Sequence, residues 1–170
     1  MKLKLNPLCS ALGAEVHGVD LSENYESSTM SAIKKAFHEN IVLLFRKQSL
    51  TPAKQVEFTS FFGAVETHPL GSRVGAESQP EILVLENCAD TPAPRNDFWH
   101  SNISFAECPP LVSVLHALEV QGEGLGDTLF CNMYKVFEDL SSGLQKTLEG
   151  LRALHSAEAL VLRNNDNDNN

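Results

Sequence analysis

The stretch at residues 96–105, NDFWHSNISF, holds the side chains of this chain that are best suited to chemistry. His100 and residue 102 stand two positions apart, the spacing at which a strand directs two side chains to one face. A histidine and a carboxylate at that spacing, joined by a second histidine, form the three-ligand face that holds non-haem Fe(II). Here the second position is Asn102, whose neutral amide oxygen is a weaker ligand for a hard dication than a carboxylate. The pattern is weak alone, because a lone histidine beside a tryptophan is more often a hydrogen-bonded structural residue.

Size and charge exclude several classes of protein. A chain of 170 residues can form one domain with its own core. Its net charge of −9 argues against nucleic-acid binding, which needs clustered Lys and Arg. The longest apolar run, IVLLF at residues 41–45, is too short to span a bilayer, and no apolar segment of a signal peptide follows the N-terminus. We therefore expect a cytoplasmic protein with no membrane or nucleic-acid partner.

The cysteines give no sign of a metal or redox motif. Cys9, Cys88, Cys108 and Cys131 contain no C-x-x-C pair, which argues against a zinc knuckle or a thioredoxin-like site. We expect buried free thiols in a reducing compartment.

The first elements that must position the 96–105 stretch follow from hydrophobic spacing. Short alternating pieces within residues 1–21 predict an edge hairpin or meander. Residues 28–40 carry apolar side chains at helical spacing after Ser and Thr, and predict a helix. The apolar run at residues 41–45 predicts a buried strand.

A second helix is predicted by its start signal. Thr51 resembles an N-cap and Pro52 a first helical residue, with Gly63 as the C-terminal cap. The Gly, Pro and Ser content of residues 66–80 predicts a loop, and residues 82–85 predict a second buried strand.

The later part of the chain alternates between strand and helix signals. Residues 111–120 have apolar side chains on one face and predict a strand. A turn is predicted at residues 122–126 and a short strand at residues 128–130. Residues 133–140 and 144–154 predict helices.

The polar residues 164–170 cannot bury enough apolar area to offset ordering entropy, so a disordered tail is predicted there. Residues 1–163 are then one domain of mixed α+β class.

Taken together, these segments resemble the taurine dioxygenase-like (TauD/TfdA) family of Fe(II)/2-oxoglutarate-dependent dioxygenases. The resemblance runs over nearly the whole chain, and each motif alone is weak. Their order and spacing carry the assignment: LGAEVHGVDL at 12–21, VLLFR at 42–46, LTP at 50–52, FG at 62–63, HP at 68–69, the 96–105 stretch, PP at 109–110 and GDTLF at 126–130.

The resemblance implies a fold. The family forms a double-stranded β-helix, or jelly roll, with flanking helices. This chain resembles its early strands and helical insert, and not the strands that close the roll. The domain at residues 1–163 is therefore expected to be C-terminally incomplete, and its unclosed edges are an aggregation risk unless another chain covers them.

The resemblance also implies residue roles. His100 matches the first metal ligand, and Asn102 stands where the family has its metal aspartate. Thr128 matches a threonine that contacts a carboxylate of 2-oxoglutarate. The positions that match the substrate pocket are His68, Asn96 and Phe105. Plainer interpretations stay open: a strand threonine, a loop histidine and a turn-capping asparagine.

The implied activity is hydroxylation of a small organic acid, a sulfonate or similar, with release of succinate and CO2. Fe(II) would be the cofactor, 2-oxoglutarate the co-substrate, and a homo-oligomer is compatible with the sequence. The alternative is a truncated, catalytically inactive member that acts as a binding module or is a non-functional remnant. Asn102 favours it, as does the lack of the family's distal histidine and arginine. Leu70 and Gly71, where taurine-oxidising members carry a tyrosine, point away from taurine itself.

Overall fold

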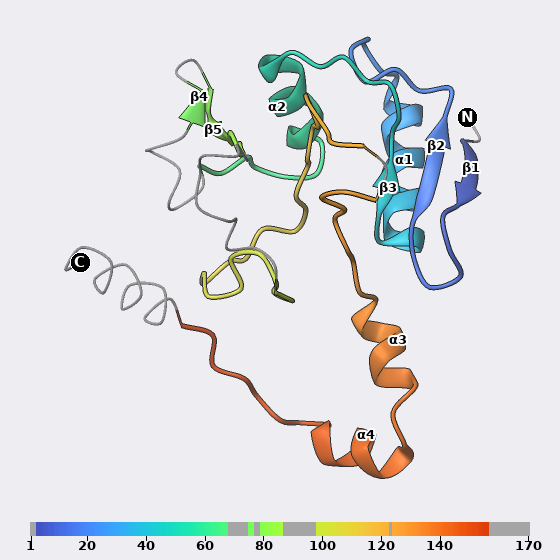
Figure 1. The fold of residues 1–170 in the computed structure, drawn as a ribbon, viewed down its shortest axis with the longest axis vertical. Helices are drawn as coiled ribbons and strands as arrows, with labels where there is room; N and C mark the ends of the chain where they lie inside the picture. The colour runs from blue at the N-terminus through green and yellow to red at the C-terminus, as the bar shows by residue number, and fades with distance from the viewer. Residues whose placement is uncertain (1–2, 68–74, 77–78, 87–97, 123, 157–170) are drawn as a thin grey trace, which may run out of the picture.

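A three-stranded sheet with a helix along one face forms the N-terminal part of the chain (Figure 1). The computed structural model describes residues 3–67, 75–76, 79–86, 98–122 and 124–156. The elements in chain order are β1 (Lys4–Pro7), β2 (Ala14–His17), α1 (Ser27–Asn40), β3 (Leu43–Leu44), α2 (Pro52–Ser60), β4 (Gly75–Ala76), β5 (Gln79–Leu83), α3 (Met133–Glu138) and α4 (Ser142–Leu148).

The sheet has the strand order β1-β2-β3. Strands β1 and β2 are antiparallel, with Lys4 opposite His17, which confirms the predicted hairpin. Strand β3 joins β2 in parallel, with Ala14 opposite Leu43, so α1 is the crossover between them. Helix α1 lies along one face of this sheet (Figure 1).

Helix α1 forms where its spacing predicts. Met30, Ile33 and Ala36 recur every three residues and are all buried, which is the pattern of a helix with one core-facing side. Met30 and Ile33 form the core cluster together with Leu21 and Phe58. The core therefore lies between α1, α2 and the sheet.

Helix α2 begins as predicted, with Pro52 at its first position and the Thr51 hydroxyl accepting a hydrogen bond from the Lys54 backbone N–H at 3.2 Å. Its predicted end at Gly63 is wrong. The helix ends at Ser60, where the Phe61 N–H donates to the Phe58 carbonyl at 3.3 Å and the Phe62 N–H to the Thr59 carbonyl at 2.9 Å. Hydrogen bonds between residues three apart tighten the last turn and pair the last carbonyl groups of the helix, so no glycine in the left-handed conformation is needed.

The predicted strand at residues 41–45 is shorter and less buried than expected. Only Leu43 and Leu44 are in β3, and both are half-buried. Ile41 has a φ of 68° and donates its N–H to the Phe37 carbonyl at 2.7 Å. Because this conformation closes α1, it removes Ile41 from the extended run.

The predicted loop at residues 66–80 also needs correction. Strand β4 lies within that range and pairs antiparallel with β5, with Gly75 opposite Leu83. Strand β5 begins at Gln79, before the predicted strand at 82–85, and ends inside it. The strand therefore begins three residues before the predicted one, at Gln79, and pairs with β4, a strand that the sequence did not predict.

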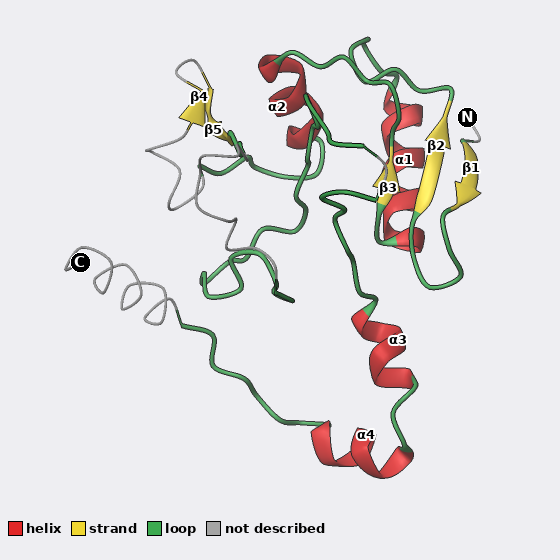
Figure 2. Cartoon of the chain, in the orientation of Figure 1, coloured by secondary structure: helices red, strands yellow, loops and turns green. Residues whose placement is uncertain are grey.

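The later part of the chain has little regular structure (Figure 2). No strand is assigned at residues 111–120 or 128–130, contrary to prediction. The turn near residue 124 is confirmed by a bond of 3.1 Å from the Leu125 N–H to the Gly122 carbonyl. Helices α3 and α4 lie where helices were predicted, but α4 ends at Leu148.

Helix and sheet are thus both present, as the mixed class predicts, and among the described residues the strands form one three-stranded and one two-stranded sheet rather than a closed jelly roll. Cys9, Cys108 and Cys131 are free and exposed, so the expectation of buried thiols is wrong for them, and Cys88 lies outside the described residues. All three stand in segments between helices and strands that pack little. In the described part of the chain, no helix has both the length and the apolarity to cross a bilayer.

Replacing Ile33 by alanine tests the core. Ile33 is 0% exposed, so Ile33→Ala should lower the free energy of unfolding by about 2–5 kcal/mol, through lost apolar contact and the cavity left behind. Urea denaturation followed by circular dichroism measures this. Lys34→Ala, at the exposed neighbouring position on α1, is the control and should change stability little. Equal effects of the two substitutions would contradict this account of the core.

Tyr25 provides a pH-dependent test. The pKa of its phenol is raised, first because burial disfavours the phenolate and then because Glu57 and Asp20 repel it. The hydroxyl also donates to the Leu21 carbonyl. A raised folded pKa means that this contribution to stability is complete below the unfolded pKa and is lost as pH rises through the folded pKa.

The measurement uses a chain with one tyrosine. The sequence has two tyrosines, so Tyr134→Phe leaves Tyr25 as the sole phenol. Phenolate absorbance should appear at higher pH in the folded variant than in the same variant unfolded in urea. Ionisation at the same or a lower pH in the folded chain would show that Tyr25 is not placed as described.

Candidate metal and co-substrate site

The segment that carries His100 and Asn102 is a turn, not a strand. Asn102 begins the turn, Ile103 has a φ of 48°, and the Ala106 N–H donates to the Ile103 carbonyl at 3.1 Å. The same-face argument for positions two apart therefore does not apply here. We call residues 98–106 the signature turn.

His100 is exposed and held by its own segment. Its Nδ1 lies 2.9 Å from the Phe98 carbonyl oxygen, and the two rings lie 5.4 Å apart between centroids. A proton on Nδ1 makes this a hydrogen bond and leaves the lone pair on Nε2. That tautomer is the one in which Nε2 can bind a metal.

Asn102 is tied to the segment that follows the turn. Its side-chain Nδ2 donates to the Ser113 hydroxyl at 3.3 Å, which directs the amide oxygen away from Ser113. The predicted pocket residue Phe105 is half-buried in the same turn. The structure therefore keeps His100, Asn102 and Phe105 in one local unit.

The other predicted residues are not brought to this unit. Thr128 is exposed, two residues after Gly126 with its φ of 68°, and among the described contacts none joins it to the signature turn. His68 and Asn96 lie outside the described residues. Of the predicted residues that the structure describes, His100, Asn102 and Phe105 therefore lie in the signature turn and Thr128 lies apart from it.

A second histidine does reach the signature turn. From the sequence, His155 is in an apparent helix and too close to the 96–105 stretch to replace the family's distal metal histidine. Helix α4 ends at Leu148 instead, and His155 Nδ1 lies 2.8 Å from the Ser104 hydroxyl. The sequence did not predict this contact, because it requires the chain to double back over fifty-one positions.

A cavity of the described part of the chain lies away from the signature turn. Its volume is about 230 Å³, and it is lined by the loop before β2, the end of α1 and the start of α3. Asn132 donates to the Ala11 carbonyl at 2.8 Å, and Lys135 to the Ser10 carbonyl at 2.9 Å. None of the predicted site residues lines it.

The sequence matches the family described as "Taurine catabolism dioxygenase TauD, TfdA family" over residues 4–168. The chain belongs to this family. An alkylsulfatase of Acinetobacter baylyi is 34% identical, with 92% of this chain and 48% of that protein aligned. A 2,4-dichlorophenoxyacetate dioxygenase of Cupriavidus pinatubonensis is 33% identical, with 92% of this chain and 59% of that protein aligned.

A solved taurine dioxygenase from Burkholderia xenovorans has a similar fold. Its TM-score is 0.65 at 24% identity, over 88% of this chain and 52% of that chain. This TauD/TfdA chain therefore spans about half the length of the relatives that it matches.

The family implies Fe(II), and the described residues do not fit it. Within residues 3–67, 75–76, 79–86, 98–122 and 124–156, no group of three His, Cys, Asp or Glu side chains is close enough to hold a metal ion. Next to His100 the available donor is the neutral amide of Asn102, which supplies no charge to balance a dication. The described residues of the signature turn therefore do not form a metal site by themselves.

Restoring the carboxylate should strengthen metal binding. We expect the chain to bind Mn(II), a stand-in for Fe(II), weakly, and Asn102→Asp to tighten binding by about tenfold, because a carboxylate replaces a neutral donor. Isothermal titration calorimetry measures the affinity.

Asn6→Asp is the matched control, since it adds the same charge at an exposed position of β1, and it should leave the affinity unchanged. His100→Ala in the Asn102→Asp background should remove the gain. An unchanged affinity for Asn102→Asp would show that position 102 does not face the metal.

Proposed function

We propose that this chain is part of a 2-oxoglutarate-dependent dioxygenase that hydroxylates a small organic acid, a sulfonate or similar, and releases succinate and CO2. The observation that carries the proposal is the family match across residues 4–168. Such a match covers all elements from β1 to α4 and the signature turn, not a single motif.

The names of the relatives support an anionic substrate. They include an alkylsulfatase, a 2,4-dichlorophenoxyacetate dioxygenase and a sulfate ester dioxygenase of Pseudomonas putida. A sulfate ester and an aryloxy acid share one anionic group on an organic body. We propose a substrate of that kind, and a cytoplasmic enzyme in view of the net charge of −9 and the free cysteines.

The proposed roles follow the family positions. His100 would be the first metal ligand, with Asn102 beside it at the position of the family's aspartate. Thr128 would contact a carboxylate of 2-oxoglutarate. The substrate-pocket residues would be His68, Asn96 and Phe105. The closed jelly roll belongs to the same proposal, with its remaining strands outside the region that this chain spans.

A second candidate function is a binding module without turnover. Asn102 favours it, because a family member that lacks the metal carboxylate can retain its shape and lose its chemistry. A homo-oligomer, which the sequence allows, stays a prediction under either function.

Succinate release separates the two functions. The isolated chain should release no more succinate from 2-oxoglutarate than its His100→Ala variant, since one strong ligand is present where three are needed. The decisive protein is a chimera in which this chain replaces the aligned part of the Acinetobacter baylyi alkylsulfatase. With Fe(II), 2-oxoglutarate and an alkyl sulfate, the Asn102→Asp chimera should release succinate, and the same chimera with His100→Ala should not.

Activity of the chimera with Asn102 unchanged would show that the amide suffices. A chimera that is folded but inactive with Asn102→Asp would refute the proposed dioxygenase and favour the binding module. The Asn6→Asp chimera controls for the added charge.

A further inference from the structure

Ile103, in the middle of the signature turn, has a backbone conformation that its own side chain disfavours. Its φ of 48° lies in the left-handed region, where a β-branched side chain is crowded by the neighbouring backbone. Glycine adopts this region at little cost, but isoleucine does not. Such a conformation persists only where the surrounding contacts hold it. The turn must therefore be held by interactions that outweigh this cost.

The residues on either side of Ile103 are each bonded to another segment. Asn102 donates to the Ser113 hydroxyl at 3.3 Å, and the Ser104 hydroxyl lies 2.8 Å from His155 Nδ1. The second contact is the shorter, and Ser104 is half-buried whereas Asn102 is exposed. The bond between Ser104 and His155 is therefore expected to be the stronger of the two.

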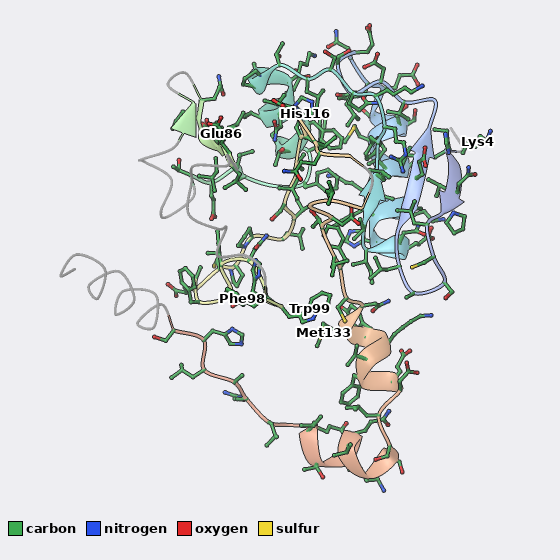
Figure 3. All side chains as sticks on the ribbon, viewed as in Figure 1. Lys4, Glu86, Phe98, Trp99, His116 and Met133 are labelled. Atoms are coloured by element: carbon green, nitrogen blue, oxygen red, sulfur yellow. The ribbon has the colours of Figure 1, made fainter. Side chains whose placement is uncertain are left out.

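His155 reaches the turn because the chain changes direction where α4 ends. Gly150 has a φ of 82°, as glycines just past a helix end often do, and the Leu151 N–H donates to the Leu148 carbonyl at 3.1 Å. Figure 3 shows Phe98, the first residue of the signature turn, on the side of the molecule where the segment after α4 runs. This course brings the imidazole of His155 to Ser104.

We propose that His155 is a positioning residue, which acts through Ser104 to hold Ile103 in the left-handed conformation. The turn that is fixed in this way is the one that presents His100, whose ring is held by the Phe98 carbonyl within the same turn. The bearing on chemistry rests on the proposed function, in which His100 is the first metal ligand. The hold on the turn itself requires no activity.

Backbone strain is what gives this contact its weight. His155 is exposed, and a hydrogen bond from an exposed side chain ordinarily contributes little to stability. Here the bond acts on the neighbour of a strained residue, so its loss should release the turn. The need for His155 should then disappear once the strain at position 103 is removed.

Hydrogen exchange of the Ala106 amide reports on the turn, because this N–H donates to the Ile103 carbonyl at 3.1 Å. In the full 170-residue chain, His155→Ala should speed this exchange about three- to tenfold, measured by NMR. His155→Asn should keep the original rate, because its side-chain amide can donate or accept close to where Nδ1 stood. Leu154→Ala, at a neighbouring side chain that is 95% exposed, is the control and should have no effect.

Two further variants separate positioning from a general loss of structure. Ser104→Ala should speed exchange as much as His155→Ala, and the double substitution should add nothing, since both remove the same bond. Ile103→Gly, added to His155→Ala, should bring the rate back close to the original, because glycine adopts a positive φ without the steric cost. Amides of α1 should exchange at an unchanged rate in every variant. Faster exchange there would make His155 a determinant of overall stability and overturn the proposal.

The proposal is also overturned if His155→Ala leaves the exchange of Ala106 unchanged, if His155→Asn fails to restore it, or if Ile103→Gly does not suppress the change. Succinate release by the Asn102→Asp chimera described above is a separate readout. His155→Ala should lower this release and His155→Asn should retain it, whereas equal release by both would show that His100 does not depend on His155. Exchange results as expected in a folded but inactive chimera would refute the proposed activity and leave the role of His155 in the turn standing.

Discussion

Contacts from the loop after β3 and from α2 hold residues 114–116 against the first part of this chain. Gln48 accepts from the Leu21 N–H at 2.6 Å and donates to the Val19 carbonyl at 3.2 Å, which fixes the loop after β3 against the chain that precedes α1. The carbonyl of Gln48 then meets His116, and Gln55 reaches Val114. These contacts hold residues 114–116 in place, although residues 111–120 belong to neither described sheet.

The candidate site is connected to this segment. Asn102 donates to Ser113, so the signature turn is attached to the exposed side of residues 111–116. The position of Asn102 therefore depends on Ser113, whereas His100 is held within the turn by Phe98.

The sequence predicted correctly those helices and strands that are determined by residues near one another in the chain. Helix α1 follows from its apolar repeat, α2 from Thr51 and Pro52, and the β1–β2 hairpin from alternation between glycines. The predictions that were wrong share one cause, which is that they concern contacts between residues far apart in the sequence. Residues 111–120 have a strand pattern but no neighbour among the described residues, and His155 reaches Ser104 because α4 ends early. Of the predicted site residues, His100, Asn102 and Phe105 are close in sequence and lie in one turn. Thr128 is far from them in sequence, so only packing between distant segments could bring it to them.

Because of Asn102, membership of the family does not by itself imply metal binding by this chain. An amide has nearly the shape of a carboxylate, so the turn and its bond to Ser113 are compatible with either residue. What differs is the charge and the direction of the bond, since a carboxylate would accept from the Ser113 hydroxyl, and a negative charge helps a ligand to bind a hard dication. Fold recognition depends on shape and apolar pattern, which Asn102 leaves intact, so a family match by itself does not establish the metal. The charge at position 102 is therefore a question separate from membership of the family.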